Sequence, residues 1–462
     1  MSNPAFRTVN PATGEQAEEY PFTTDAEIDA ALKASHEAFA EWGSRPIEER
    51  AAIVQRVADL FAEKAGELAS VATGEMGKPI GEMREEAEFC SEIFGYYASH
   101  GPTQLGDQVL SEDESSVSMI QRRPVGALLG IMPWNYPYYQ VARFVAPNLV
   151  TGNTILLKHA EICPGSALAI QAIMEEAGVP AGVYQNIFAT YDQVSTIIAS
   201  PIVQGVSLTG SERAGSSIAA QAGQHLKKAV LELGGSDPYV VLSSKDVRAQ
   251  AREALEIRLE NTGQACNSNK RMIVMDDIFD EFVDELVKQV DELQAGDPAE
   301  GAESTYGPMS SETAAQNIVA QIEEAVSSGA TLHTGGTRQD RPGFYVAPAV
   351  ITGVTPASRA YREELFGPAA VVYRVSSDEE ALQLANDTVY GLGAAVYATE
   401  QGRAETFAEK LEAGMVGANA QAPETADMPF GGVKRSGYGR ELGPLGIDEF
   451  VNKRLMHVAK NG

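Results

Sequence analysis

The sequence predicts an α/β protein in which strands and helices alternate along most of the chain. From Val125 onward, short apolar runs of strand length are separated by helical segments, as in a parallel sheet covered by helices. A second series of the same kind begins at Tyr239. The chain has 462 residues, 44% of them apolar, and this length exceeds what one hydrophobic core usually organises. We therefore expect two α/β domains.

The residues before the first series predict two amphipathic helices. Thr24 and Glu27 form a capping-box pattern before apolar residues at helical spacing, from Ile28 to Trp42. Apolar residues recur at the same spacing over 47–68. These apolar faces need something to cover.

The two series supply the strands and helices of the expected domains. The first holds the runs ALLGIM, TILLK, YQNIFA, VQGVSL and AVLEL, with helices over 164–177 and 211–223. The second holds YVVL and RMIVM, with helices over 246–260 and 278–293. Segment 105–124 and the C-terminal KRLMHVA alternate in polarity, which predicts a hairpin and an edge strand.

Composition excludes several classes of protein. A net charge of −29 disfavours nucleic acid as a partner, because phosphate binding needs basic patches. No apolar run approaches the length of a membrane span, and the start lacks a signal-peptide pattern. Three scattered cysteines make no disulfide framework, which favours the cytoplasm. Six scattered histidines show no metal-ligand spacing, so we expect no metal.

Glu232 and Cys266 are the candidate catalytic pair. A cysteine attacks a carbonyl as the thiolate, of which only a few per cent exists at neutral pH, so a nearby base is useful. Both residues lie in small, glycine-bearing sequence, LELGGSDP and GQAC. Either residue alone is unremarkable, because a lone Cys is usually a buried apolar residue and a lone Glu a solvated charge.

Seven motifs in matching order carry a resemblance that covers nearly the whole chain. They are MPWNYP at 132–137, LLKHAE at 156–161, SLTGSERAG at 207–215, LELGGSDP at 231–238, GQAC at 263–266, EELFGP at 363–368 and MPFGGVKRSGYGREL at 428–442. With these motifs the chain resembles the aldehyde dehydrogenase superfamily, nearest the succinate-semialdehyde dehydrogenase branch.

The resemblance implies an aldehyde dehydrogenase-like fold with three parts. A Rossmann-type cofactor domain would hold residues 1–104 and 125–233, and an α/β catalytic domain would hold residues 234–427. Residues 105–124 and 445–462 would form a small β oligomerisation flap, so we expect a homodimer or homotetramer.

The cofactor residues come partly from position and partly from the resemblance. Ligands of doubly wound sheets bind beyond the carboxyl ends of strands, where Lys158 and Glu161 follow TILLK. Glu161 would repel a 2′-phosphate, so we expect NAD rather than NADP. The turn after VQGVSL replaces the absent G-x-G-x-x-G fingerprint. The full expected set is Trp134, Lys158, Glu161, Gly210, Ser211, Gly215, Glu364 and Phe366.

The implied mechanism passes through a thiohemiacetal and a thioester on Cys266. The Asn135 side chain and the Cys266 backbone N–H would stabilise the oxyanion. Glu232 would activate the water that releases a free carboxylic acid. Relatives that transfer the acyl group to coenzyme A typically lack this glutamate, so we expect a hydrolytic enzyme.

The substrate residues leave alternatives open. By resemblance, Tyr136, Tyr139, Arg143 and Phe430 line the aldehyde site, and Arg143 would bind the carboxylate of succinate semialdehyde. Glu260 and the acids of the loop before PFGG depart from the succinate-semialdehyde pattern. Glu260 would either pair with Arg143 or favour a cationic substrate. Aromatic or amino-aldehydes are therefore alternatives, and a cysteine hydrolase or a non-catalytic binding protein on the same fold are alternatives of another class.

Overall fold

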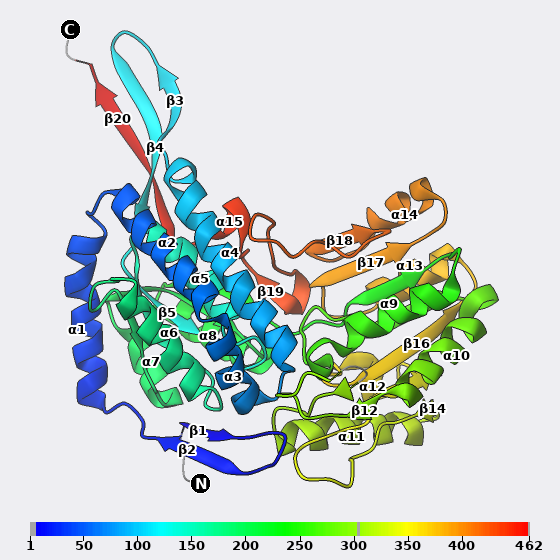
Figure 1. The fold of residues 1–462 in the computed structure, drawn as a ribbon. Helices are drawn as coiled ribbons and strands as arrows, with labels where there is room; N and C mark the ends of the chain where they lie inside the picture. Colours follow the sequence, from blue (N-terminus) through cyan, green and yellow to red (C-terminus); the bar gives the residue numbers. More distant parts are fainter. Residues whose placement is uncertain (1–5, 303–304, 461–462) are drawn as a thin grey trace.

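The first of three larger sheets is a parallel sheet with helices on both faces (Figure 1). The computed structural model describes residues 6–302 and 305–460. The sheet has the order β19-β9-β8-β5-β6-β7, with β5 (Ala127–Ile131), β6 (Thr154–Lys158), β7 (Tyr184–Asn186), β8 (Val203–Thr209) and β9 (Lys228–Glu232) parallel and β19 (Gly437–Tyr438) antiparallel.

Alternate residues of these strands point to opposite faces, so a sheet covered on both sides needs apolar residues at every position. Leu128 belongs to the core on one face and Leu129 to the core on the other. The first face packs against α2 (Ile47–Glu63), α3 (Ala65–Met76), α4 (Ile80–Gln104), α5 (Tyr139–Thr151) and α6 (Pro164–Glu176). The second packs against α1 (Asp25–Trp42), α7 (Tyr191–Ala199) and α8 (Glu212–Gln224).

The second sheet repeats this arrangement. Its order is β14 (Thr331–Thr334), β15 (Ala349–Thr352), β16 (Ala369–Val375), β11 (Arg271–Met275), β10 (Pro238–Val241), β17 (Gly393–Tyr397) and β18 (Met415–Ala418), parallel except for β14. One face packs against α9 (Val247–Leu259) and α10 (Asp276–Glu292). The other packs against α11 (Glu312–Ser327), α12 (Arg359–Arg362), α13 (Asp378–Asn386) and α14 (Gln401–Ala408).

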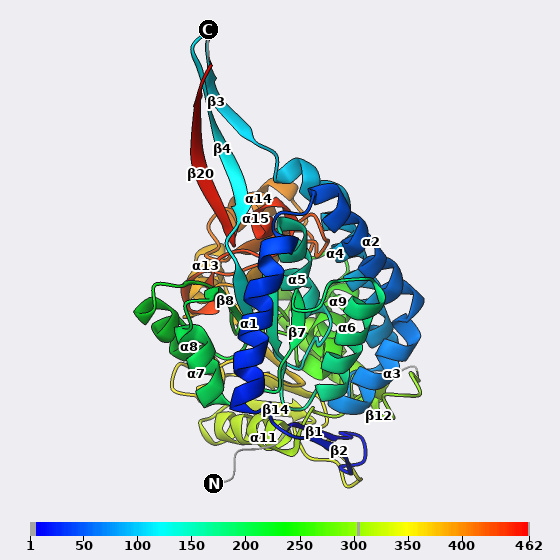
Figure 2. The same cartoon turned by 90° about the vertical axis from the view of Figure 1, so that its left-hand side faces the viewer.

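The third sheet joins a hairpin to the end of the chain and projects away from the body (Figures 1 and 2). It consists of β3 (Gln108–Glu112), β4 (Ser116–Pro124) and β20 (Val451–Ala459), all antiparallel. Several of its apolar side chains are exposed, among them Val109 at 55% and Leu455 at 68%.

The remaining elements are short. They are β1 (Phe6–Val9), β2 (Gln16–Tyr20), β12 (Gln294–Ala295), β13 (Thr305–Tyr306), α15 (Gly443–Ile447) and the 3₁₀ helices η1 (Glu260–Gly263) and η2 (Lys434–Ser436). None of the helices in residues 6–302 and 305–460 combines the length and apolar character that a membrane-spanning helix needs.

Strand order in the first sheet creates a crevice between β5 and β8. The chain leaves β5 toward β6 on one side and leaves β8 toward β9 on the other. Such a reversal separates the two following loops at the carboxyl edge, and ligands of open α/β sheets bind there. The loop after β5 carries Trp134 and Asn135, and the loop after β8 carries Gly210 and Ser211.

The predicted α/β architecture is confirmed, with a local difference in the first helices. The capping box at Thr24 is present, and the TILLK and RMIVM runs coincide with β6 and β11. The single helix expected over 47–68 is instead two helices, because the chain turns at Lys64. The apolar spacing continues through the turn, so both helices still face the same core.

Candidate active site

One strand end and two loops carry the predicted catalytic residues. Glu232 is the last residue of β9, Asn135 lies between β5 and α5, and Cys266 lies between η1 and β11. The β9–β10 loop touches the cysteine segment, because a Cβ on Gly235 would lie 2.4 Å from the Cys266 carbonyl oxygen. A glycine is therefore needed where these backbones meet.

A strained turn precedes the nucleophile. Asn261, Thr262 and Gly263 all have positive φ, of 48°, 55° and 75°, and the two non-glycine residues persist there only because their surroundings hold them. The Asn261 side chain donates to the Asn135 carbonyl at 2.8 Å, and the Asn135 Nδ2 donates to the Gln264 carbonyl at 3.0 Å. These two bonds join the asparagine to the cysteine segment.

Lys270 holds the backbone at Cys266. Its side chain is only 1% exposed, and Nζ donates to the carbonyls of Ala265 and Cys266 at 2.7 Å each. Glu364 lies 3.1 Å from the same ammonium and also accepts from the Gly235 N–H at 3.1 Å. The carboxylate that the resemblance puts on the cofactor ribose is therefore anchored to the catalytic loop.

Burial controls the protonation of the catalytic pair. Burial raises the pKa of the Cys266 thiol to about 12, and the charges of Arg143 and Lys270 act in the opposite direction. Burial, with a contribution from Glu441, also raises the pKa of Glu232 well above its usual range. Glu232 is 2% exposed, and neither carboxylate oxygen has a hydrogen-bond partner. Burial therefore favours the protonated form of both groups, the thiol and the carboxylic acid.

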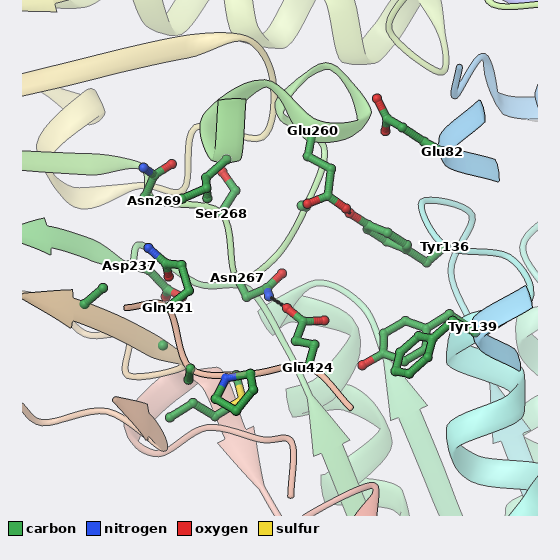
Figure 3. Close-up of a pocket in the computed structure, with 18 of the residues that line it drawn as sticks. Glu82, Tyr136, Tyr139, Asp237, Glu260, Asn267, Ser268, Asn269, Gln421 and Glu424 are labelled. Atoms are coloured by element: carbon green, nitrogen blue, oxygen red, sulfur yellow. Dashed lines mark hydrogen bonds between the residues drawn. The ribbon is translucent and has the colours of Figure 1, made fainter. Parts of the chain in front are cut away.

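A cavity of about 520 Å³ opens next to the segment that carries Cys266 (Figure 3). Its walls include Tyr136, Tyr139, Glu260, Asn267 and Glu424. The Tyr136 hydroxyl donates to Glu260 at 2.6 Å, and Asn267 donates to Glu424. Because Ala265 and Asn267, the two neighbours of Cys266 in the chain, both line it, the cavity lies beside the nucleophile.

Arg143 is buried against Tyr139, a wall of this cavity, and its Nη1 and Nη2 have no hydrogen-bond partner in the structure. It is 1% exposed, and its Nε lies 2.8 Å from a carboxylate oxygen of Glu441. The guanidinium carbon lies 4.5 Å from the Tyr139 ring centre and 4.3 Å from that of Phe430. The pairing with Glu260 that the sequence left open is therefore wrong, because each residue has another partner.

The cofactor residues surround the crevice between β5 and β8. Lys158, at the end of β6, pairs with Glu161, and Ser211 caps α8 by accepting from the Ala214 N–H at 3.3 Å. The Thr209 hydroxyl is buried without a partner in the structure. A Cβ on Gly210 would meet only Leu208, at 3.7 Å, so the backbone there is open. An orphaned donor and an open helix N-terminus fit a dinucleotide phosphate.

Three more expected cofactor residues take up distinct positions. The Trp134 and Phe366 rings meet edge to face, with centroids 5.7 Å apart. Gly215 lies inside α8, where a Cβ would lie 2.6 Å from Leu233. Its role in the structure is the packing of that helix on the sheet.

Sequence reasoning missed several residues that organise the site. Lys270 and Glu441 were not singled out, although both lie within the quoted motifs or beside them. Glu86 was also missed; it accepts from the backbone N–H groups of Tyr138 and Tyr139 at 2.9 and 3.0 Å. A buried carboxylate on α4 has no sequence signal, because glutamate is common on exposed helix faces.

The comparisons identify the family. The aldehyde dehydrogenase family matches residues 1–456. A succinate-semialdehyde dehydrogenase from Deinococcus radiodurans, with NADP(+) in its name, is 51% identical over 98% of this chain and 94% of its own length. A similarly named protein from Mycobacterium avium is 39% identical, over 98% of this chain and 97% of its own. The crystal structure of succinic semialdehyde dehydrogenase from Streptococcus pyogenes in complex with NADP+ has a TM-score of 0.95 and 40% identity, covering 99% of this chain and all of that one (100%).

The chain belongs to the aldehyde dehydrogenase family. It is an enzyme that oxidises an aldehyde with a nicotinamide cofactor, as the resemblance implied. The fold is the aldehyde dehydrogenase fold.

The expected preference for NAD is wrong. The relatives above carry NADP(+) in their names, and one solved relative holds NADP+. The argument from Glu161 treated its carboxylate as an isolated charge. In the structure Glu161 forms an ion pair with Lys158, and this pairing compensates the charge that was expected to repel a 2′-phosphate.

Proposed function

We propose that this protein converts a short aldehyde into the free carboxylic acid through a thioester on Cys266, with Glu232 as the base for hydrolysis. The observation that carries the proposal is the Glu232 carboxyl group, buried with both oxygens unpartnered. A buried polar group without a partner costs stability, so its retention at a catalytic position favours a chemical role. A base that activates water is needed for hydrolysis of the thioester. An enzyme that transfers the acyl group to the thiol of coenzyme A does not need it.

The first half of the reaction forms the thioester. Cys266 gives its proton to water, and its sulfur bonds to the aldehyde carbon as the C=O π bond opens, giving the anion of the thiohemiacetal. The side-chain amide of Asn135 has two N–H donors. One donates to the Gln264 carbonyl, and the other remains to stabilise the oxyanion. A nicotinamide beside Trp134 and Phe366 would supply the acceptor for the hydride of that carbon, which would leave the thioester.

The second half releases the acid. Once Glu232 has released its proton to solvent, its carboxylate takes a proton from a water molecule as the water oxygen bonds to the thioester carbon. The carbon–sulfur bond then breaks, the product leaves as the free acid, and the Cys266 sulfur takes the proton that Glu232 had accepted. The raised pKa of Glu232 suits this exchange, because a carboxylate that binds protons tightly is the better base.

We propose NADP+ as the cofactor, on the names of the relatives and on the pairing of Glu161 with Lys158. Lys158, Thr209, Gly210 and Ser211 would hold it, with Trp134, Glu364 and Phe366 beside the nicotinamide end. Lysine is a frequent partner of phosphate groups, as a point charge.

We also propose the three-part division given by the sequence and a homodimer or homotetramer built through the projecting sheet. Its exposed apolar residues, Val109, Leu110 and Leu455, support an interface. The cysteines at 90, 163 and 266 are free thiols, which supports a cytoplasmic location.

The test is turnover with NADP+ and a panel of small aldehydes. Succinate semialdehyde, which the relatives' names supply, is the reference compound, and NADPH absorbance and chromatography of the acid are the readouts. We expect Cys266→Ala to abolish turnover. Cys90→Ala, at a buried cysteine in α4, is the matched control and should keep it. Turnover by Cys266→Ala would contradict the mechanism.

A further inference from the structure

His159 is a buried titratable residue that the mechanism above does not use. It directly follows Lys158, the last residue of β6, and it is 0% exposed. A histidine in a protein core needs partners for both ring nitrogens, because a buried polar atom without a partner costs stability. Both nitrogens of His159 have one.

The two hydrogen bonds of the ring join two loops at the carboxyl edge of the first sheet. His159 Nε2 lies 2.9 Å from the carbonyl oxygen of Pro137, in loop 132–138, which carries the oxyanion donor. The Ala160 N–H donates to His159 Nδ1 at 2.8 Å, in loop 159–163, which follows the cofactor lysine. The imidazole therefore bridges loops 132–138 and 159–163.

These partners fix the protonation of the ring. The Pro137 oxygen only accepts, so Nε2 carries the proton, and the Ala160 N–H only donates, so Nδ1 carries none. Burial lowers the pKa of His159 to about 4, and the charge of Lys158 acts in the same direction. The ring is therefore neutral near pH 7 and is held in one tautomer, as a rigid spacer.

His159 takes the place of a helix donor at the start of α5. The backbone carbonyls directly before and after that of Pro137 accept from N–H groups of the helix, at 3.2 and 2.9 Å. His159 supplies the donor for the Pro137 oxygen between them. Proline has no N–H, so its carbonyl is the backbone polar group through which a hydrogen bond can fix it.

The oxyanion donor Asn135 lies two residues before Pro137 in the same loop. The cysteine segment holds it from one side, because Asn261 donates to its carbonyl and its amide donates to that of Gln264. His159 holds the loop from the side of the first sheet. A donor stabilises an oxyanion only when it is fixed at hydrogen-bond distance, so both holds bear on catalysis.

We infer that His159 is a positioning residue, which holds loop 132–138 so that the Asn135 amide meets the oxyanion. The inference rests on the proposed function, in which Asn135 stabilises that charge. Loss of the Pro137 bond should displace the amide while the cofactor residues, which β6 and α8 hold, stay in place. Because a displacement of about 1 Å can cost about a hundredfold in rate, a smaller shift of a loop still held from one side should cost about tenfold.

Two amide side chains separate the two bonds of the ring. The longer amide of His159→Gln reaches the position of Nε2 and can donate to the Pro137 carbonyl, whereas the amide of His159→Asn reaches only the position of Nδ1. His36→Asn, at an exposed histidine of α1, is the matched control.

The measurement is a single turnover of succinate semialdehyde with saturating NADP+ and excess enzyme, followed by NADPH absorbance. Its rate constant does not depend on the fraction of protein that is folded, so a loss of stability alone leaves it unchanged. Quenching of tryptophan fluorescence by NADP+ gives the Kd of the cofactor separately.

We expect the rate constant to fall about tenfold in His159→Asn and to stay within about threefold of wild type in His159→Gln. The Kd for NADP+ should change by less than about twofold in both, because the ring contacts no expected cofactor residue through its two bonds. The His36→Asn control should match wild type in both measurements.

A double-mutant cycle tests whether the effect passes through Asn135. Asn135→Ala removes the oxyanion donor and should slow the single turnover by about a hundredfold or more. In that background His159→Asn should add less than about twofold, because the amide that it displaces is already absent.

The outcomes are distinguishable. An unchanged rate constant in His159→Asn, equal losses in His159→Gln and His159→Asn, or a full further loss in the Asn135→Ala background overturns the positioning role and leaves the proposed function intact. An Asn135→Ala variant as fast as wild type refutes the oxyanion donor of the proposed function and the inference with it.

Discussion

Glu232→Gln tests the division of the reaction into two halves. The substitution removes the base for hydrolysis and keeps the shape of the side chain. Since neither oxygen of Glu232 accepts a hydrogen bond, no protein partner is lost, and the fold should tolerate the change. The first half, which ends in the thioester, should continue.

The size of the effect follows from the role. A positioned general base contributes about 100- to 10,000-fold to a proton-transfer step. We therefore expect steady-state turnover to fall by about that factor, while the first turnover still releases about one NADPH per active site as a burst. Rapid mixing with NADP+ and aldehyde measures both quantities in one trace.

The same variant makes a prediction about stability. Burial raises the native pKa of Glu232 above the unfolded value of 4.5, so the native state binds this proton more tightly. As pH rises above that value, the wild-type protein loses up to about 1.4 kcal/mol of unfolding free energy per pH unit through this group, until the native pKa is reached. Glutamine does not titrate, so the stability of the variant relative to wild type should increase from pH 5 to pH 8. Two results together would refute the assignment of Glu232. The variant would turn over as fast as wild type without a burst, and the difference in unfolding free energy between variant and wild type would not vary with pH.

Three further perturbations test the surroundings of the site. Glu86→Gln leaves the Lys78 charge buried without its partner, so the unfolding free energy measured in urea should fall by about 3–5 kcal/mol. A fall of less than about 1 kcal/mol would contradict the ion pair between Lys78 and Glu86. With the Cys266 pKa near 12, alkylation by iodoacetamide should accelerate about tenfold per pH unit from pH 7 to 9, whereas a plateau in that range would show a stabilised thiolate. Glu161→Gln frees Lys158 for a 2′-phosphate, so the KM for NADP+ should fall about three- to tenfold, and an unchanged KM would exclude that role.

Local patterns in the sequence predicted much of the fold. TILLK and RMIVM are continuous apolar runs, which strands buried on both faces require, and they coincide with β6 and β11. The break at Lys64 was not predictable, because the spacing of apolar residues continues across it. The short strand β19 was also missed, since it pairs with β9 from a distant part of the chain and two residues carry no periodicity.

The sequence by itself determined the alternation of strands and helices, the family motifs and the identities of Cys266, Glu232 and Asn135 as candidates, because these depend on residue type and spacing. Only the tertiary structure decided which charges meet. It pairs Arg143 with Glu441, Lys158 with Glu161 and Lys270 with Glu364. A charge acts through its distance to other charges and its exposure to water, and both are properties of the folded chain. The prediction of NAD was wrong because it considered the charge of Glu161 without its ion-pair partner, Lys158.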